Sequence, residues 1–238
     1  MEKIIVYTHS DCLAKDNGPN HPERKERLET VLESVKELDN IDIEIKEAPL
    51  ASPDTINLVH PQSHIDAIFS MIPNTGLVGV EKEPYADTFL CEHSKDAILR
   101  SCGAGIAAAD DLINSTEKRI FCAVRPPGHH AETTRVNGFC FVNNVAVSAR
   151  YLQNQYQLGK IAIIDFDVHH GNGTQEIFYR DNSVAYGSIH EHPLFPGTGS
   201  ENETGVGNIF NAPIKSGTTS QDFLNIFERK IIENIDKF

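Results

Sequence analysis

Short apolar runs alternate along the chain with segments in which apolar residues recur every three or four positions. The runs predict strands, and the spaced segments predict helices with one apolar face. This alternation is typical of an α/β fold built on a parallel sheet. We expect strands at 1–7, 41–45, 120–124, 161–164, 184–189 and 209–214. Polar loops are expected at 8–20 and 73–84. We expect helices to start at Pro22, at the caps Ser52, Ser94 and Ser220, and near residues 62, 143 and 175.

Length and composition narrow the classes of protein. The 238 residues suffice for one large α/β domain. No segment is long and apolar enough for a membrane span, and the N-terminus does not resemble a signal peptide, so we expect a cytoplasmic protein without a membrane partner. The net charge of −13 argues against direct nucleic-acid binding. The five cysteines include no C-x-x-C pair, which indicates reduced packing residues.

Acidic and imidazole groups follow the run 161–164 without a break. The run contains only Ile and Ala, which predicts a strand buried on both faces. Asp165, Asp167 and His169 come next at every second position, so they project to one side if the extended conformation persists. Such a group at the carboxyl end of a buried strand suits a divalent metal. For Asp165 the alternative is an ion pair or a cap on the next turn.

The pair His129-His130 follows the expected strand 120–124 in the same way. The prolines of Arg125-Pro126-Pro127 end the strand there. A lone histidine in a loop is more often solvated or locally hydrogen-bonded. Two strand ends that both carry such groups weaken that interpretation, because functional groups gather at the carboxyl ends of parallel strands.

Several motifs together carry a family resemblance. They are R-P-P-G-H-H-A-E at 125–132, G-F-C-F-V-N-N at 138–144, D-F-D-V-H-H-G-N-G at 165–173 and F-P-G-T-G at 195–199. The chain resembles the histone deacetylase and acetylpolyamine amidohydrolase family from its first strand to about residue 214. H-P-E-R at 21–24 and Asn172 are similar to the class II and bacterial branches.

The resemblance implies a three-layer arginase-deacetylase fold with a mainly parallel central sheet flanked by helices. It also implies zinc-dependent hydrolysis, in which a metal-activated water removes an acetyl or other acyl group from a lysine side chain or a polyamine. Asp167 and His169 would be zinc ligands. His130 would act as general base and then general acid, while His129 would act through charge and hydrogen bonding.

Supporting roles are implied for the neighbouring polar residues. Asp165 would accept a hydrogen bond from His129, and Asn172 would accept one from His130. A structural potassium ion would bind Asp165, the Ser188 hydroxyl and the main-chain oxygens of three residues, namely Asp167, His169 and Ile189.

Phe139 and Phe195 resemble the aromatic walls of an acyl-lysine tunnel. Gly138 beside them would let the substrate stem pass. The alternative for both phenylalanines is ordinary core packing, the commoner place for Phe.

The chain departs from the family pattern at its C-terminal side. In the family an aspartate that binds zinc and a catalytic tyrosine come from strands after the last helix seen here, and no residue of this sequence can be assigned to either role. We therefore expect residues 1–238 to be a single deacetylase-like domain that lacks its C-terminal strands and has weak or no activity alone. The alternatives are a non-catalytic binding module and, less well matched, a manganese hydrolase of the arginase type. The sequence does not indicate an oligomeric state.

Overall fold

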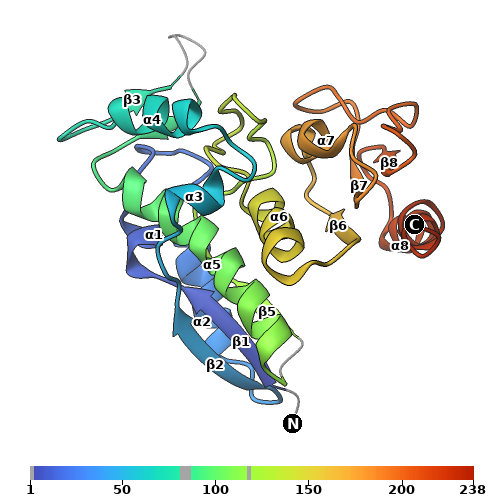
Figure 1. The fold of residues 1–238 in the computed structure, drawn as a ribbon, viewed down its shortest axis with the longest axis horizontal. Coiled ribbons are helices and arrows are strands. Elements are labelled where there is room, and N and C mark those ends of the chain that lie inside the picture. The colour runs from blue at the N-terminus through green and yellow to red at the C-terminus, as the bar shows by residue number, and fades with distance from the viewer. Residues whose placement is uncertain (1–2, 81–86, 117–118) are drawn as a thin grey trace. The chain divides into compact units, whose positions relative to one another are not determined.

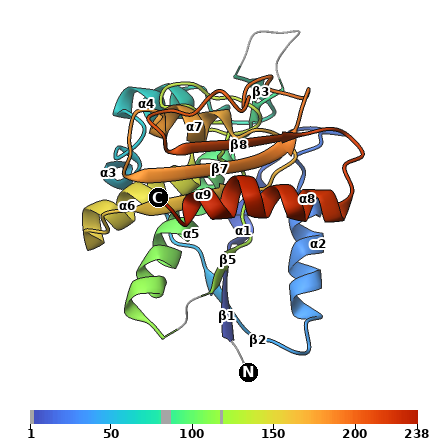
Figure 2. The ribbon, with the colours of Figure 1, turned by 90° about the vertical axis from the view of Figure 1, so that its right-hand side faces the viewer.

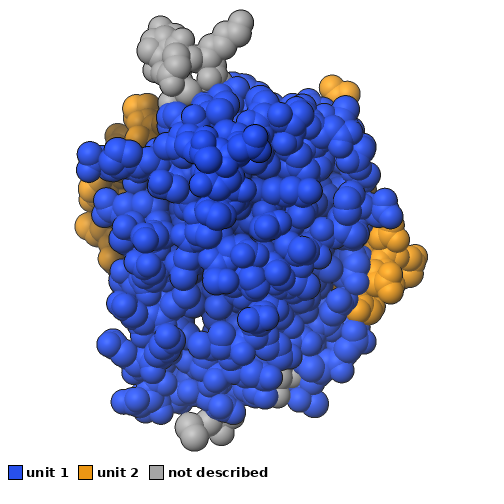
Figure 3. Space-filling view, turned by 90° about the vertical axis from the view of Figure 1, so that its left-hand side faces the viewer, with its two compact units in different colours: residues 1–151 blue, residues 152–238 orange. Residues whose placement is uncertain are grey.

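The chain forms two compact units, residues Met1–Tyr151 and Leu152–Phe238 (Figure 3). The computed structural model describes residues 3–80, 87–116 and 119–238, so the expected loop 73–84 falls outside the described residues from 81 onward. We describe each unit by itself.

A three-stranded parallel sheet forms the centre of the first unit (Figure 1). Its order is β2-β1-β5, and both pairings with β1 are parallel. The elements up to residue 156 are β1 (Lys3–Thr8), α1 (Ser10–Ala14), α2 (Lys25–Lys36), β2 (Asp42–Glu47), α3 (Pro53–Ile56), α4 (Gln62–Ser70), β3 (Val78–Gly79), β4 (Phe89–Leu90), α5 (Ser94–Asn114), β5 (Ile120–Cys122) and α6 (Asn144–Tyr156).

Helices cover both faces of this sheet because β1 is apolar on both sides. Ile5 and Tyr7 pack against small residues of α5, among them Ala104. Val6 points to the other face and packs with Leu28 of α2. This two-residue alternation is the geometry of a strand between two helical layers.

A second apolar core supports the segment after β5. Phe141 and Val142 are buried there with Ile56 of α3, Ile65 of α4 and Ile98 of α5. The chain that carries the histidine pair therefore ends in a packed region and not in a free loop.

The second unit has its own parallel sheet, in the order β6-β7-β8. The C-terminal helical segment lies along β7 and β8 (Figure 2), where Ile231 packs against Ile189 and Ala212. A Cβ on Gly187 would lie 2.5 Å from the Ile231 side chain, so glycine permits this close approach. The elements are β6 (Ile161–Asp165), α7 (Asn172–Phe178), β7 (Val184–Glu191), β8 (Ile209–Ile214), α8 (Ser220–Phe227), a π-helical turn (Glu228–Ile232) and α9 (Glu233–Ile235).

The prediction of an α/β fold with parallel strands flanked by helices is confirmed. The prediction that 161–164 is buried on both faces is wrong, because Ile163 is buried while Ile164 is 37% exposed. In the same way Phe121 of β5 is 44% exposed. Side chains of a strand project alternately to its two faces, so β6 has one buried and one exposed face.

Several predicted helix starts are displaced. Helix α2 begins at Lys25, after Pro22, and α1 lies within the segment expected to be a loop. The Ser94 hydroxyl accepts the Cys91 N–H at 2.8 Å and lies inside α5. Helix α8 is capped by Thr219, one residue before the expected Ser220.

Within the described residues, no helix is both long and apolar enough to cross a membrane.

Candidate active site

The loop that carries His129 and His130 is anchored at its start by Arg125. This guanidinium is buried against the Glu23 carboxylate, with Nη2 2.9 Å from Oε2 and Nε bonded to Oε1. Its Nη1 also donates to the carbonyl oxygens of Cys12 at 2.8 Å and Lys15 at 3.2 Å. The H-P-E-R segment therefore fixes the start of the histidine loop.

Buried charge dominates this anchor. Burial lowers the pKa of Lys15 to about 8, although the nearby Glu23 opposes that change. Burial also raises the pKa of Glu23, but the hydrogen bonds and charge of Arg125 outweigh it, so the net pKa is lowered. Lys15 Nζ donates to Asn17 Oδ1, and Asn17 Nδ2 donates to Glu23 Oε2 at 2.6 Å. Glu23 is therefore ionised between two buried cations.

His60 and Asn143 anchor the other end of the loop. His60 Nε2 accepts the Asn143 N–H at 2.9 Å, and Nδ1 donates to the Thr133 carbonyl at 3.1 Å. The Asn143 amide donates to the Ala131 carbonyl and caps α6 by accepting the Ala146 N–H at 3.1 Å. Burial lowers the pKa of His60 to about 4, so the ring is neutral in this role.

His129 and His130 lie against each other between these anchors. Their ring centroids are 4.0 Å apart and the rings are inclined by 45°. His130 is 5% exposed, whereas His129 is half-buried. The two rings therefore differ in access to water although they are adjacent in the chain.

Gly138 packs directly on the His130 ring. A Cβ at position 138 would lie 2.3 Å from His130 Cδ2, and the backbone φ of Gly138 is +51°. Only glycine satisfies both the contact and the left-handed conformation. The first unit thus brings together three predicted site residues, His129, His130 and Gly138, with Phe139 next in the chain.

The predicted metal ligands in the second unit are joined by a turn. The strand ends at Asp165, whose Oδ1 accepts the Asp167 N–H at 3.1 Å. Asp167 Oδ1 then accepts the His169 N–H at 2.8 Å and lies 3.1 Å from His169 Nδ1. The extended conformation does not persist to residue 169, so the condition for the three side chains to project to one side is not met, because aspartate side chains bond to amides two residues on.

This turn still places Asp167 and His169 together and in reach of solvent. Their side chains are 48% and 39% exposed, and the intervening Val168 is also exposed. An anionic oxygen beside a ring nitrogen suits a borderline metal such as zinc. The pair fits as two ligands of such an ion. Among residues 3–80, 87–116 and 119–238, no group of three His, Cys, Asp or Glu side chains is arranged to hold one.

Asp165 has a different environment from Asp167. Its Oδ2 accepts the Tyr186 hydroxyl at 2.9 Å, and it lies opposite Ser188 in the register of β6 with β7. Burial raises the pKa of Tyr186 well above its usual value, and the Asp165 charge adds to this. Asp165 is thus a structural acceptor in this unit, separate from the exposed Asp167.

The turn after β6 runs beside β7. The Glu191 N–H donates to the Val168 carbonyl at 2.8 Å, and the buried Ser188 hydroxyl lies 3.0 Å from His190 Nδ1. This brings the residues predicted to hold potassium, Asp165, Ser188 and Ile189, into one region of the sheet.

Phe195 and Asn172 flank the turn in the second unit. The Phe195 ring meets His169 edge to face with centroids 6.2 Å apart. Asn172 is the buried first residue of α7. The predicted bonds from His129 to Asp165 and from His130 to Asn172 join residues of different units and stay predictions.

A buried network in the second unit was not predicted. His170 Nε2 donates to Gln175 Oε1 at 3.1 Å, and the Gln175 amide donates to Glu203 at 2.6 Å. Glu203 accepts the Gly199 N–H at 3.0 Å, and His190 Nε2 bonds to the Gly199 carbonyl at 3.0 Å. The second histidine of the H-H-G motif and the glycines of F-P-G-T-G were the available signals in the sequence.

These groups differ in protonation. Burial lowers the pKa of His170 to about 4, and the neighbouring His190 adds to this. Burial raises the pKa of Glu203, but hydrogen bonds led by the Ser200 amide outweigh it and lower the pKa overall. The network therefore fixes the 195–199 segment with neutral rings and one ionised carboxylate.

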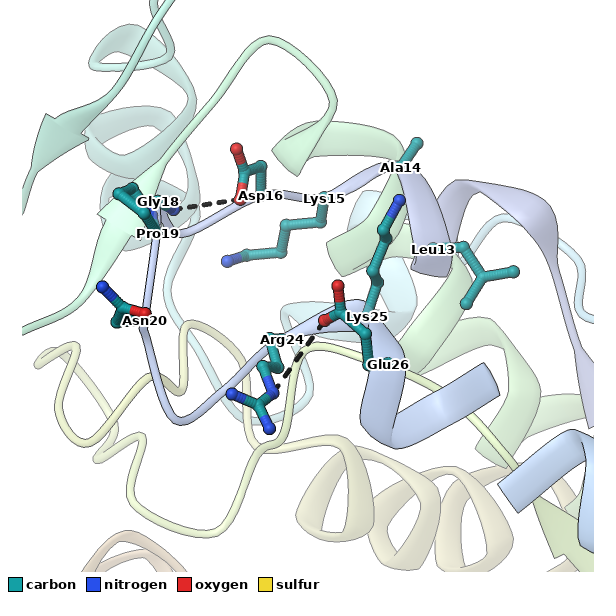
Figure 4. Close-up of a pocket in the computed structure, with 10 residues that line it drawn as sticks. All are labelled: Leu13, Ala14, Lys15, Asp16, Gly18, Pro19, Asn20, Arg24, Lys25 and Glu26. Carbon is teal, nitrogen blue, oxygen red and sulfur yellow. Dashed lines mark hydrogen bonds and ion pairs between the residues drawn. The ribbon is translucent and has the colours of Figure 1, made fainter. Parts of the chain in front are cut away.

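A cavity of about 870 Å³ lies elsewhere in the first unit, between α1 and α2 (Figure 4). Asp16 accepts the Gly18 N–H there at 3.0 Å, and Arg24 pairs with Glu26 at 4.0 Å. None of the predicted site residues lines this cavity. Size alone therefore does not identify the site.

Comparison with known proteins gives one consistent family. Residues 21–238 match the family described as Histone deacetylase domain. The chain is 32% identical to a Probable deacetylase of Archaeoglobus fulgidus, over 98% of this chain and 65% of that protein. It is 33% identical to Histone deacetylase 10, chloroplastic, of Oryza sativa subsp. japonica, over 98% of this chain and 56% of that protein.

A solved structure gives the same result at the level of the fold. The crystal structure of the HDA15 HD domain matches with a TM-score of 0.89 and 30% identity, over 100% of this chain and 70% of that one. The chain spans less than two thirds of the length of the two curated relatives.

Proposed function

This chain belongs to the histone deacetylase domain family, and on that premise we propose that it is a zinc-dependent amidohydrolase that removes acyl groups from amines. The observation that carries the proposal is the pair Asp167 and His169. Their ligand atoms lie 3.1 Å apart on an exposed turn at the end of a parallel strand. A turn with only a structural role would not need both groups to face solvent.

We assign zinc binding to Asp167 and His169. When bound, zinc supplies Lewis-acid chemistry that polarises the acyl carbonyl and acidifies water. His130 takes a proton from the attacking water and later gives it to the nitrogen of the leaving amine, so the products are a carboxylic acid and an amine, which end as a carboxylate and an ammonium after proton transfer between them. His129 supports His130 by charge and hydrogen bonding.

We assign orienting roles to Asp165 and Asn172, as acceptors of hydrogen bonds from imidazole N–H groups. Asp165, Ser188 and the main-chain oxygen of Ile189 also form an oxygen-rich region suited to a potassium ion. The register of β6 with β7 supports this assignment, because it sets Asp165 beside Ser188.

The substrate class that we propose is an acetylated lysine side chain or an acetylpolyamine in the cytoplasm. We assign Phe139 and Phe195 the role of aromatic walls of the acyl-lysine tunnel, and Gly138 the role of leaving room for the entering stem. A net charge of −13 favours a cationic substrate. Residues 1–238 act in this proposal as one deacetylase-like domain.

The test measures release of acetate from an acetyl-lysine peptide and from N-acetylputrescine, with zinc content measured on the same samples. We expect His130→Ala to lose at least about a hundredfold in rate and to keep its zinc. Asp167→Asn should lose zinc as well as turnover. His93→Ala removes an exposed histidine of the same unit and serves as the control. Measurable wild-type turnover that is unchanged in His130→Ala would exclude the mechanism.

A non-catalytic binding module is the second candidate. The described residues supply no third metal ligand beside Asp167 and His169, which favours this alternative. It predicts saturable binding of the acetyl-lysine peptide, measured by calorimetry, with no acetate release at any zinc concentration.

A further inference from the structure

Gly138 and Phe139 form the tip of a tight turn. Asn137 and Cys140 pair on either side of it, with N–H to carbonyl distances of 3.2 and 2.9 Å. Both central residues have positive φ, +51° for Gly138 and +68° for Phe139. This conformation suits glycine but is strained for a bulky residue such as phenylalanine. Such a residue keeps it only where its surroundings hold it in place.

Two contacts hold Phe139 in this conformation. Its N–H donates to the buried Thr88 hydroxyl at 3.0 Å, and Thr88 donates to Asp87 Oδ1 at 2.8 Å. Its ring meets the His21 imidazole edge to face, with centroids 4.8 Å apart and an angle of 74° between the rings. Backbone and side chain of Phe139 are therefore fixed by different partners.

His21 is itself locked. Its Nε2 lies 2.8 Å from the Asp87 carbonyl oxygen, and Nδ1 lies 3.0 Å from the Glu23 amide nitrogen and 3.1 Å from the Glu23 carbonyl oxygen. A carbonyl oxygen can only accept, so Nε2 donates to Asp87, while both contacts of Nδ1 are with the backbone of Glu23. The ring also meets Phe89 edge to face at 5.9 Å. These contacts fix the imidazole in the orientation in which it packs edge to face against the Phe139 ring.

The same turn touches the proposed base. Gly138 packs on the His130 ring while the adjacent Phe139 packs on His21. A change in the position of Phe139 would therefore displace Gly138 and, through it, the His130 ring.

We propose that His21 is a positioning residue that buttresses the Phe139 ring and thereby narrows the acyl-lysine tunnel, so that short acyl groups are admitted in preference to long ones, acetyl in preference to butyryl. This inference rests on the proposed function, in which Phe139 forms a wall of that tunnel. Removing the imidazole lets the strained turn relax and the Phe139 ring move into the vacated space. The tunnel then widens for longer acyl chains.

The experiment compares wild type with three variants of the full chain. His21→Ala removes both the ring contact and the hydrogen bonds. His21→Phe keeps a ring against Phe139 and loses the bonds to Asp87 and Glu23. His93→Ala is the control. Each is measured by kcat and KM on acetyl- and butyryl-lysine peptides, by circular dichroism for folding, and by NMR of ring-labelled phenylalanine with the Phe139 signal assigned from Phe139→Leu.

We expect His21→Ala to raise the ratio of butyryl to acetyl kcat/KM about tenfold, the range for one or two methylenes in a pocket. Its KM for the acetyl substrate should rise more than its kcat falls, and the Phe139 ring signal should shift. His21→Phe should restore most of the selectivity. His93→Ala should match wild type in every measurement.

An unchanged Phe139 signal and an unchanged ratio in folded His21→Ala would overturn the inference. Absence of turnover and of acyl-peptide binding in wild type would instead overturn the proposed function and the acyl selection that rests on it. The ring signal separates the two failures, because it reports on the contact between His21 and Phe139 without any substrate.

Discussion

The two units fix their parts of the candidate site differently, the first with buried charged groups and the second mainly with neutral hydrogen-bonding groups. The first unit fixes the start of the histidine loop with buried charges, Glu23 between Arg125 and Lys15. The second unit fixes the 195–199 segment mainly with neutral groups, His170, Gln175 and His190. Buried ions are costly to separate, whereas neutral hydrogen bonds are individually weaker. The units should therefore respond differently when one member of each network is removed.

The largest effect is expected from Glu23→Gln. It leaves the guanidinium of Arg125 and the ammonium of Lys15 buried without their counter-ion, which costs on the order of 3–5 kcal/mol. Hydrogen exchange under increasing urea should show the loss in peptides of the first unit. Glu26→Gln alters only an exposed pair with Arg24 at 4.0 Å and is the matched control. Equal stability of the two variants would show that the buried charge contributes nothing.

Acid should weaken the first unit through buried His60, and the second through buried His170 together with His190, whose pKa burial also lowers. The pKa values of His60 and His170 are lowered to about 4, so the folded state favours the neutral ring. The free energy of unfolding is therefore highest above about pH 6.5, the pKa of histidine in the unfolded chain. It decreases by about 1.4 kcal/mol per pH unit and per ring as the pH falls toward 4. Hydrogen exchange measured between pH 7 and 4.5 gives the change of the free energy of unfolding with pH for each unit.

Two variants show which histidine causes the pH dependence of stability in each unit. Glutamine can accept and donate in place of the imidazole but does not titrate. His60→Gln should flatten the slope in the first unit only, whereas His170→Gln should reduce it in the second unit only, where His190 still contributes. Slopes that match wild type in both variants would place the titration on other groups.

A smaller loss is expected from Gln175→Ala, at about 2 kcal/mol. The side chain accepts from His170 and Asn211 and donates to Glu203, so its removal leaves buried polar groups of the second unit without a partner at this point. Urea denaturation followed by exchange in the second unit gives the measurement. Gln221→Ala removes an exposed glutamine and should change nothing. A loss as large as that of Glu23→Gln would contradict the contrast between the units.

The smallest effect concerns the cap of α8. The Thr219 hydroxyl accepts the Asp222 N–H at 3.2 Å, so Thr219→Ala should cost about 1 kcal/mol. Ser220→Ala, the position that the sequence pattern favoured, should be neutral. Thermal unfolding with exchange in α8 distinguishes the two. The reverse order of effects would assign the cap to Ser220.

The elements of the fold could be predicted from the apolar pattern, because strands such as β7 and β8 carry a strong local signal. The exposure of their side chains could not, since burial of Ile164 depends on which elements pack over that face of β6. His130, Asp167 and His169 became candidates because they follow predicted strands, the motifs gave their roles, and the structure added the contact of Gly138 with His130. The turn after Asp165 was missed because aspartate side chains bonded to amides in place of an extended backbone.

The buried networks were missed for a different reason. Glu23 and Arg125 are 102 residues apart, and His60 and Asn143 are 83 apart. No local pattern links such positions. The residue type alone does not distinguish a neutral histidine with a structural role from one that acts as a base.

The separation of Glu23 and Arg125 also bears on how the protein folds. Closing a loop of 102 residues has an entropic cost that must be met before the contact stabilises anything. The Tyr186–Asp165 bond of the second unit closes only 21 residues. Contacts of long sequence separation slow folding. We therefore expect the turn of Asp167 and His169 to be in place early, while the loop of His129 and His130 becomes ordered only when the first and fifth strands have met.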